Sequence, residues 1–433
     1  MNFAIILEEL ADGLSVFRIA SIFVVVLFVY YRLFRRRIAS ILDPLAYTVF
    51  FSTGTVTLLF VLSARSIVST EKLLFTLATL LLFYGAFYCI TVPPGRSMVQ
   101  PRTPRNQSPP RTLAVLFGAN TILLLITYSF FGIPLLMESR LALWSGGGGV
   151  GAIGRLSGGL QFVSVLLGFV ALYDGTPRKL WAKLLIAQFV LSAMLSGSKG
   201  SLLTGIYAWY LAQVYVTGSW RVGLRLTPTT LLVTVIVFIS PLLVIVIQNR
   251  EQSISLLEVA FAFIMRVAAE GDGYVYFFAD DVIDQISHFD LLALLRPILT
   301  GLRIVSADTA FNPGFEVVRE VFVIDDPVSG PNSRLPIYLI YFYGYAGIVL
   351  APLLGMMLGH ARNVTLRSTG GTAMRFSVAG AVYLLCTKLE ADPQITMNGL
   401  FDLFLAAPVL LFAKLCGRPY RMVAPKPPVR MQT

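Results

Sequence analysis

One short stretch of the chain places an arginine, two carboxylates and two tyrosines close together. Arg266 lies in the apolar sequence AFAFIMRVAAEGDGYVYFF, where Glu270, Asp272, Tyr274 and Tyr276 follow it. A guanidinium among apolar residues is costly unless it is paired, and Glu270, one helical turn later, is the simplest partner. The same group could instead bind a sugar, because a carboxylate can act as a general base towards a sugar hydroxyl. We therefore treat Arg266, Glu270 and Asp272 as candidate catalytic residues and Tyr274 as a candidate substrate contact.

Further basic residues are suited to binding phosphate, because arginine can hold an oxyanion through two parallel hydrogen bonds. Arg140 and Arg155 flank a glycine-rich run whose backbone could wrap a ligand, with a flexible loop as the alternative. Lys199 lies in the sequence SGSKGS at 196–201, which predicts either an anion site built from backbone N–H groups or a tight turn. Arg250 begins a long polar insertion and is another candidate contact.

The glycine run also contains a formal G-x-G-x-x-G pattern at Gly149, Gly151 and Gly154. A dinucleotide site needs a preceding strand and a βαβ unit. Long apolar runs flank the pattern instead, so we interpret it as a chance match and expect no nucleotide cofactor.

Polar residues also mark the ends of the last apolar runs. Asn332 and Arg334 precede one run, and Lys388 and Glu390 end the next; all four are candidate substrate contacts. Asp402 lies inside the final run, where an acid is a functional candidate by default, although a structural pair with Lys388 is an alternative.

The elements that must position these residues are membrane-spanning helices. The chain has 433 residues, of which 56% are hydrophobic and 13% are charged, about half the charged fraction of a soluble protein. Eleven apolar runs are long enough to approach or cross a hydrocarbon core of about 30 Å. The sequence therefore predicts an all-α polytopic membrane protein with about 11 transmembrane helices. The runs are 16–34, 42–63, 72–92, 112–136, 156–173, 179–197, 200–217, 228–247, 334–359, 374–390 and 396–415.

The distribution of charge predicts the orientation. The net charge is +11, and 21 of the 34 Lys and Arg residues, Arg362 among them, fall in alternate loops and the C-terminal tail. The positive-inside rule makes those loops cytoplasmic, so we expect a periplasmic N-terminus and a cytoplasmic C-terminus. No basic cluster is joined to an aromatic platform, so we expect no nucleic-acid partner. The three cysteines stand singly in or beside apolar runs, which indicates core residues and no metal site.

Three regions are predicted. Residues 1–248 form an N-terminal transmembrane bundle of about eight spans, and 334–433 form about three spans with a basic cytoplasmic tail. Between them, 249–333 form a periplasmic loop domain that holds 13 of the 23 acids. Within it, 254–268 and 291–305 are expected to be short amphipathic helices at the membrane interface.

These features together resemble the O-antigen polymerase (Wzy) family of oligosaccharide repeat-unit polymerases. The resemblance covers the architecture of the whole chain. At residue level it depends on Arg140 with its following glycines, 196–201, Arg266, 332–347 and 387–393.

The resemblance implies a metal-independent glycosyl transfer at the periplasmic face of a bacterial inner membrane, without a cofactor. The donor would be a growing chain on undecaprenyl diphosphate, and the acceptor a lipid-linked repeat unit in the same bilayer. A chain-length regulator protein is a candidate partner. An O-antigen ligase of the same architecture and a lipid-linked glycan flippase or transporter remain alternatives. The ligase is expected to use a periplasmic histidine, for which His288 is the one candidate.

Overall fold

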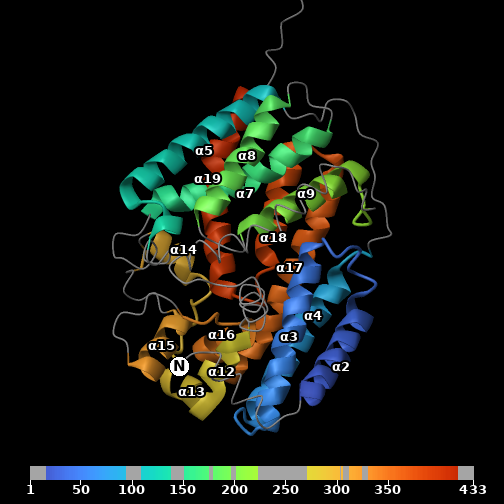
Figure 1. Cartoon of the computed structure of the whole chain (residues 1–433), viewed down its shortest axis with the longest axis vertical. Helices are drawn as coiled ribbons and strands as arrows, with labels where there is room; N and C mark the ends of the chain where they lie inside the picture. The colour runs from blue at the N-terminus through green and yellow to red at the C-terminus, as the bar shows by residue number, and fades with distance from the viewer. Residues whose placement is uncertain are drawn as a thin grey trace, which may run out of the picture.

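The computed structural model is an all-α polytopic membrane protein (Figure 1). It describes residues 16–93, 109–137, 151–174, 179–196, 201–222, 271–302, 304–305, 312–323 and 330–417. Within these ranges, six helical stretches are long and apolar enough to cross a membrane, and three shorter apolar helices accompany them.

Ten of the eleven predicted spans coincide with helices, and the remaining span, 228–247, lies outside the described residues. Apart from the run 334–359, the predicted boundaries lie within a few residues of the helix ends, because capping residues and prolines mark many of them. Asp43, for example, accepts a hydrogen bond from the Leu45 amide, and Pro44 occupies the first helical turn. The long helices of the first half of the chain are α2 (Val16–Phe34), α3 (Pro44–Ala64), α4 (Thr70–Ile90), α5 (Pro110–Phe131), α7 (Gly151–Tyr173), α8 (Leu180–Leu195) and α9 (Ser201–Thr217).

The predicted single span 334–359 is wrong in detail. It consists of α16 (Leu335–Tyr343), a 3₁₀ turn (Gly344–Val349) and α17 (Leu350–Arg367). The break occurs at Gly344, whose φ of 59° is a left-handed value that glycine adopts readily. All nine residues of α16 are buried, and a broken helix is tolerated at membrane depth where protein surrounds it. The chain continues through α18 (Ala373–Cys386) and α19 (Pro393–Cys416).

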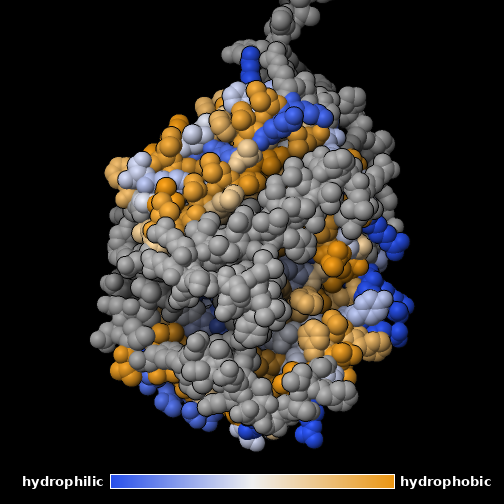
Figure 2. Space-filling view, in the orientation of Figure 1, coloured by the Kyte–Doolittle hydropathy of each residue, from blue (hydrophilic) through white to orange (hydrophobic). Residues whose placement is uncertain are grey.

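Helix α7 occupies the centre of the upper half of the molecule, where it contacts α5, α8, α9, α18 and α19 (Figure 1). Helices α2, α3 and α4 form a second group, which α17 joins by packing along α4. The close approach depends on Gly355, because a Cβ there would lie 2.0 Å from the Phe83 carbonyl oxygen. Hydrophobic side chains cover the outer surface of α5 in Figure 2, among them the exposed Ile122 and Leu125, as expected of a lipid-facing helix.

The described part of the 249–333 region consists of short helices. They are α12 (Asp272–Phe278), α13 (Val282–Ile286), α14 (Arg296–Gly301) and α15 (Pro313–Phe322). The predicted amphipathic helix 291–305 is helical only over α14, and the other predicted helix, 254–268, lies outside the described residues. Helices α12 and α13 pack against α16, and α14 packs against α19, so this region contacts the beginning and the end of the C-terminal group of helices.

Two buried cations hold distant helices together. Arg362, which the charge pattern places in a cytoplasmic loop, is instead buried inside α17 and contacts Asp43 at 2.7 Å and the Tyr383 hydroxyl at 3.0 Å. Lys72 at the start of α4 donates to Asp281 at 2.5 Å and to Asp284 at 2.8 Å. The Lys72 contacts attach the acidic insertion to the group formed by α2, α3 and α4.

Candidate functional site

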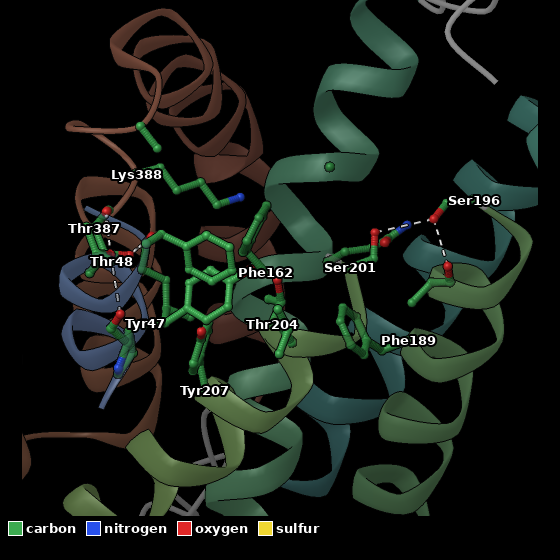
Figure 3. Close-up of a pocket in the computed structure, with 18 of the residues that line it drawn as sticks. Tyr47, Thr48, Phe162, Phe189, Ser196, Ser201, Thr204, Tyr207, Thr387 and Lys388 are labelled. Carbon is green, nitrogen blue, oxygen red and sulfur yellow. Dashed lines mark hydrogen bonds between the residues drawn. The ribbon is translucent and has the colours of Figure 1, made fainter. Parts of the chain in front are cut away.

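A cavity of about 340 Å³ lies where α3, α7, α8, α9 and the turn between α18 and α19 meet (Figure 3). Three of the predicted binding residues, Arg334, Lys388 and Glu390, line it. So do Ser196 and Ser201, the first and last residues of the predicted anion site at 196–201. Segments that are far apart in the sequence therefore converge on a single cavity.

Arg334 and Glu390 bind each other and are both completely buried. The guanidinium donates to the carboxylate through Nε at 3.2 Å and through Nη2 at 2.5 Å, which is a bidentate pair. The Glu390 carbonyl also accepts the Leu335 amide at 2.9 Å, so the α18–α19 turn is attached to the start of α16. Because the two charges neutralise each other, this pair adds structure and no net charge to the cavity wall.

Lys388 is the lining cation that forms no ion pair among the described residues; burial lowers the pKa of its ammonium, and the Asp392 carboxylate, which favours the charged form, opposes that effect. Its side chain contacts the Phe162 ring, 5.5 Å from Nζ to the ring centroid. Figure 3 shows the side chain reaching over the rings that form the cavity floor. Arg334, Glu390 and Lys388 are the charged residues among the described lining, so the cavity has a net charge of +1. A cavity of this sign favours an anion.

The remaining walls consist of hydroxyls, amides and aromatic rings. Tyr47, Phe51, Phe162 and Phe189 supply rings, while Thr204, Ser192 and Gln161 supply polar groups. In the part that the structure describes, the buried Tyr207 hydroxyl has no hydrogen-bond partner. A buried hydroxyl without a partner is unfavourable unless a ligand or water satisfies it, and this one borders the cavity. Rings that alternate with hydroxyls suit a sugar, which has apolar faces and polar edges.

The candidate residues on α12 lie next to this cavity. Gly273 packs so closely on residue 332 that a Cβ would lie 2.6 Å from the Asn332 carbonyl oxygen. That carbonyl accepts the Arg334 amide at 3.1 Å, which links α12 to the Arg334–Glu390 pair. Asp272 is half-buried at the first position of α12. Tyr274 lies in the interior against Phe278, and burial raises the pKa of its hydroxyl, so it is a neutral core residue and not an exposed sugar platform.

Arg155 forms a second polar cluster at the edge of the cavity. It donates to Asp402 at 3.0 Å and to Asn398 at 3.2 Å, so Asp402 pairs with Arg155 and not with Lys388. Helices α7 and α19 touch at this point, since a Cβ on Gly159 would lie 2.1 Å from the Asp402 carbonyl oxygen. The neighbouring Gly158 lines the cavity. A Cβ at this position would lie 3.8 Å from the Asp402 carboxylate, which is an ordinary van der Waals distance.

The cavity is recessed within the helical bundle. The helices that end beside it, α8, α9 and α18, have 16, 17 and 14 residues and are therefore only about 21–26 Å long. The Thr48 hydroxyl donates a hydrogen bond of 2.9 Å to the carbonyl of Thr387. The charge pattern places Thr48 in the cytoplasmic part of α3 and Thr387 on the periplasmic side. Residues that the charge pattern assigns to opposite sides of the membrane are thus in contact beside the cavity.

The candidates Arg140, Lys199, Arg250, Arg266 and Glu270 lie outside the described residues. His288 is exposed and is not among the described residues that line the cavity. Within the described ranges, no three His, Cys, Asp or Glu side chains are grouped so as to hold a metal ion.

The sequence analysis missed Tyr207 and Lys72. Nothing in the sequence distinguishes Tyr207 from the other residues of its apolar run. For Lys72 a signal was present, because a lysine at the start of an apolar run needs a partner and the acidic insertion could supply one.

The chain was compared with protein-family models, with curated proteins and with solved structures, and nothing matches it.

Proposed function

We propose that the protein is a glycosyltransferase that polymerises undecaprenyl-diphosphate-linked oligosaccharide repeat units into O-antigen or a related surface polysaccharide. The reaction would take place at the periplasmic face of a bacterial inner membrane. The observation that carries the proposal is the cavity, in whose described lining Lys388 is the one cation without an ion pair and lies among hydroxyls and aromatic rings. A glycosyl diphosphate has the same two parts, an anion and a sugar.

In the proposed reaction an acceptor hydroxyl attacks the anomeric carbon of the donor sugar. The new C–O bond forms as the bond to the diphosphate breaks, and undecaprenyl diphosphate leaves with the bonding electrons. Lys388 would stabilise the charge that develops on this leaving group, as preorganised cations do in other group transfers. No nucleotide is needed, since the lipid diphosphate supplies the activated bond.

The acceptor proton needs a destination, and a carboxylate in 270–272 is the candidate. Asp272 opens α12, the helix whose Gly273 contacts the carbonyl of Asn332 beside Arg334. A general base contributes about 10²–10⁴ in rate. Asp272→Asn combined with Glu270→Gln should therefore leave mainly single repeat units. Long chains made by the folded double variant would remove the carboxylates from the mechanism.

The recessed position of the cavity supports the same chemistry. A glycosyl diphosphate can be lost to hydrolysis, and a site enclosed by short helices limits access of water to the reacting bond. Electrostatic contacts are also stronger where water is excluded.

The test is a gel of the surface glycan after deletion of the gene from its host, with the intact gene and a Lys388→Met variant returned on a plasmid. Loss of a polymerase leaves one repeat unit on the lipid anchor. Loss of a ligase leaves none, and loss of a flippase traps the unit on the cytoplasmic side. A single-repeat phenotype that the intact gene reverses and the variant does not is the expected result. Either of the other two patterns would reject the polymerase assignment.

A further inference from the structure

The segment from residue 289 to 304 has its polarity reversed relative to a water-soluble surface. Every residue that is exposed in its described part is apolar, while the acid within it is hidden. Phe289 and Leu291 are 69% and 73% exposed, whereas Asp290 between them is 7% exposed. The exposed residues are Phe289, Leu291, Leu292, Leu295, Leu302 and Ile304.

The charges of this segment face inwards and satisfy each other. Asp290 forms an ion pair with Arg296 and accepts the Leu292 amide at 2.9 Å. Burial raises the pKa of Asp290, but the hydrogen bonds from Arg296 and from the Leu292 amide outweigh that effect and lower it below its ordinary value. The Asp290 carboxylate is therefore charged at neutral pH and buried, while the side chain of its partner Arg296 is 22% exposed.

Helix α16 holds the segment in place. The amides of His288 and Asp290 donate to the carbonyls of Tyr341 and Phe342, each at 2.9 Å, and the Leu294 amide donates to the Tyr343 hydroxyl at 3.3 Å. The two carbonyls belong to the last turn of α16 and have no acceptor role inside the helix. The apolar side chains are thus presented outwards by a backbone that is fixed to the protein.

A neighbouring helix of the same region shows what a water-facing surface looks like in this protein. Helix α15 exposes Arg319 and Glu320 together with one apolar residue, Val321, and keeps Val317 buried. The two surfaces belong to one insertion, so their difference indicates two environments.

We propose that the 289–304 surface docks on the lipid bilayer, so that this part of the insertion lies on the membrane and not in the water beyond it. Lipid is the occupant because the surface is continuous with one that must face lipid. Helix α14 packs on α19, whose exposed residues include Ile395 and Phe404. Apolar residues that extend a transmembrane surface sideways are typical of interfacial segments.

The docking has a consequence for the cavity. Helix α16 carries the docked segment at its C-terminal end and follows directly on Arg334 at its other end. Its nine residues separate the two by about 14 Å. The bilayer surface would then set the depth of the Arg334–Glu390 pair, whatever reaction the protein performs. The inference needs a membrane protein and does not depend on the proposed polymerase activity.

Spin labels can measure the depth of this surface. The full chain, with Cys89, Cys386 and Cys416 replaced, would carry one new cysteine at Leu291 or Leu295 and be reconstituted into phosphatidylethanolamine–phosphatidylglycerol vesicles. A label at Glu320 on α15 is the matched control. Labels at 291 and 295 should collide more often with oxygen, which concentrates in lipid, than with a water-soluble nickel chelate. The label at 320 should show the opposite order.

Two results would overturn the proposal. A label at 291 that behaves like the one at 320 would mean that the surface faces water. Exclusion of both reagents, with dipolar broadening between labels, would mean that a second copy of the chain covers it. A circular-dichroism melt of each labelled protein, compared with the cysteine-free parent, identifies any variant that has lost its fold. A Phe289→Cys label then gives an independent reading.

Discussion

Lys388 is the residue on which the proposed chemistry can be tested most directly. Lys388→Met removes the ammonium and keeps a flexible apolar side chain that can still contact Phe162. A hydrogen bond to a charged group contributes about 1.5–3 kcal/mol. Because about 1.4 kcal/mol corresponds to a factor of ten, Lys388→Met should weaken binding of a diphosphate about 10- to 100-fold. Lys388→Arg keeps the charge and should lose much less.

The assay is calorimetric titration of the purified protein in detergent with farnesyl diphosphate, a short soluble analogue of the lipid diphosphate. Farnesol, which lacks the phosphates, separates binding of the anion from binding of the hydrocarbon chain. Lys414→Met is the matched control, because Lys414 is an exposed lysine in the last turn of α19. Equal affinity in the Lys388→Met and Lys414→Met variants, at equal thermal stability, would refute the assignment of the anion site. So would equal affinity for farnesol and farnesyl diphosphate.

Three further predictions test the surrounding structure. Arg334→Ala leaves the buried Glu390 without a partner and should reduce the free energy of unfolding by about 3–5 kcal/mol. The double variant Arg334→Met, Glu390→Leu has no buried charge left at this position, so a thermal melt should show that it recovers much of the lost stability. Gly159→Ala places a methyl group against α19 and should destabilise the protein by about 1–3 kcal/mol. Gly158→Ala has ordinary van der Waals room and should melt at the same temperature as the parent. Equal melting temperatures of the two variants would contradict the close contact between α7 and α19. Arg266→Lys should impair polymerisation nearly as much as Arg266→Ala, because lysine lacks the planar fork; full chain length in the lysine variant would reduce Arg266 to a point charge.

The spans were predictable because each depends on local information. Apolar length identifies a helix that crosses a bilayer, and residues such as Asp43, Pro44 and Pro393 mark where helices begin. The break at Gly344 was not predicted, since the residues on both sides are equally apolar and a hydropathy pattern cannot register a change of backbone direction. The glycine itself was the one available signal.

The pairing of charges could not be predicted, since it depends on tertiary contacts. Arg334 and Glu390 were each recognised as candidates, but 56 positions separate them and nothing in the local sequence identifies them as partners. Asp402 was considered a partner for Lys388, yet it lies almost three turns into α19 and faces Arg155 on α7. Arg362 was counted as a loop residue because the apolar run fades before it, whereas α17 continues to Arg367 and buries it against Asp43.

These pairings change which charges can do chemistry. The sequence offers several cations for a diphosphate, and on composition alone they are interchangeable. Arg334 is paired with the fully buried Glu390, so it cannot bind a phosphate without giving up that carboxylate, while the partly exposed Arg155 is paired with Asp402. Abandoning a buried carboxylate costs several kcal/mol, more than a phosphate contact returns. In the described part of the site the charge available to a ligand is therefore that of Lys388, and the two arginines hold the helices that place it.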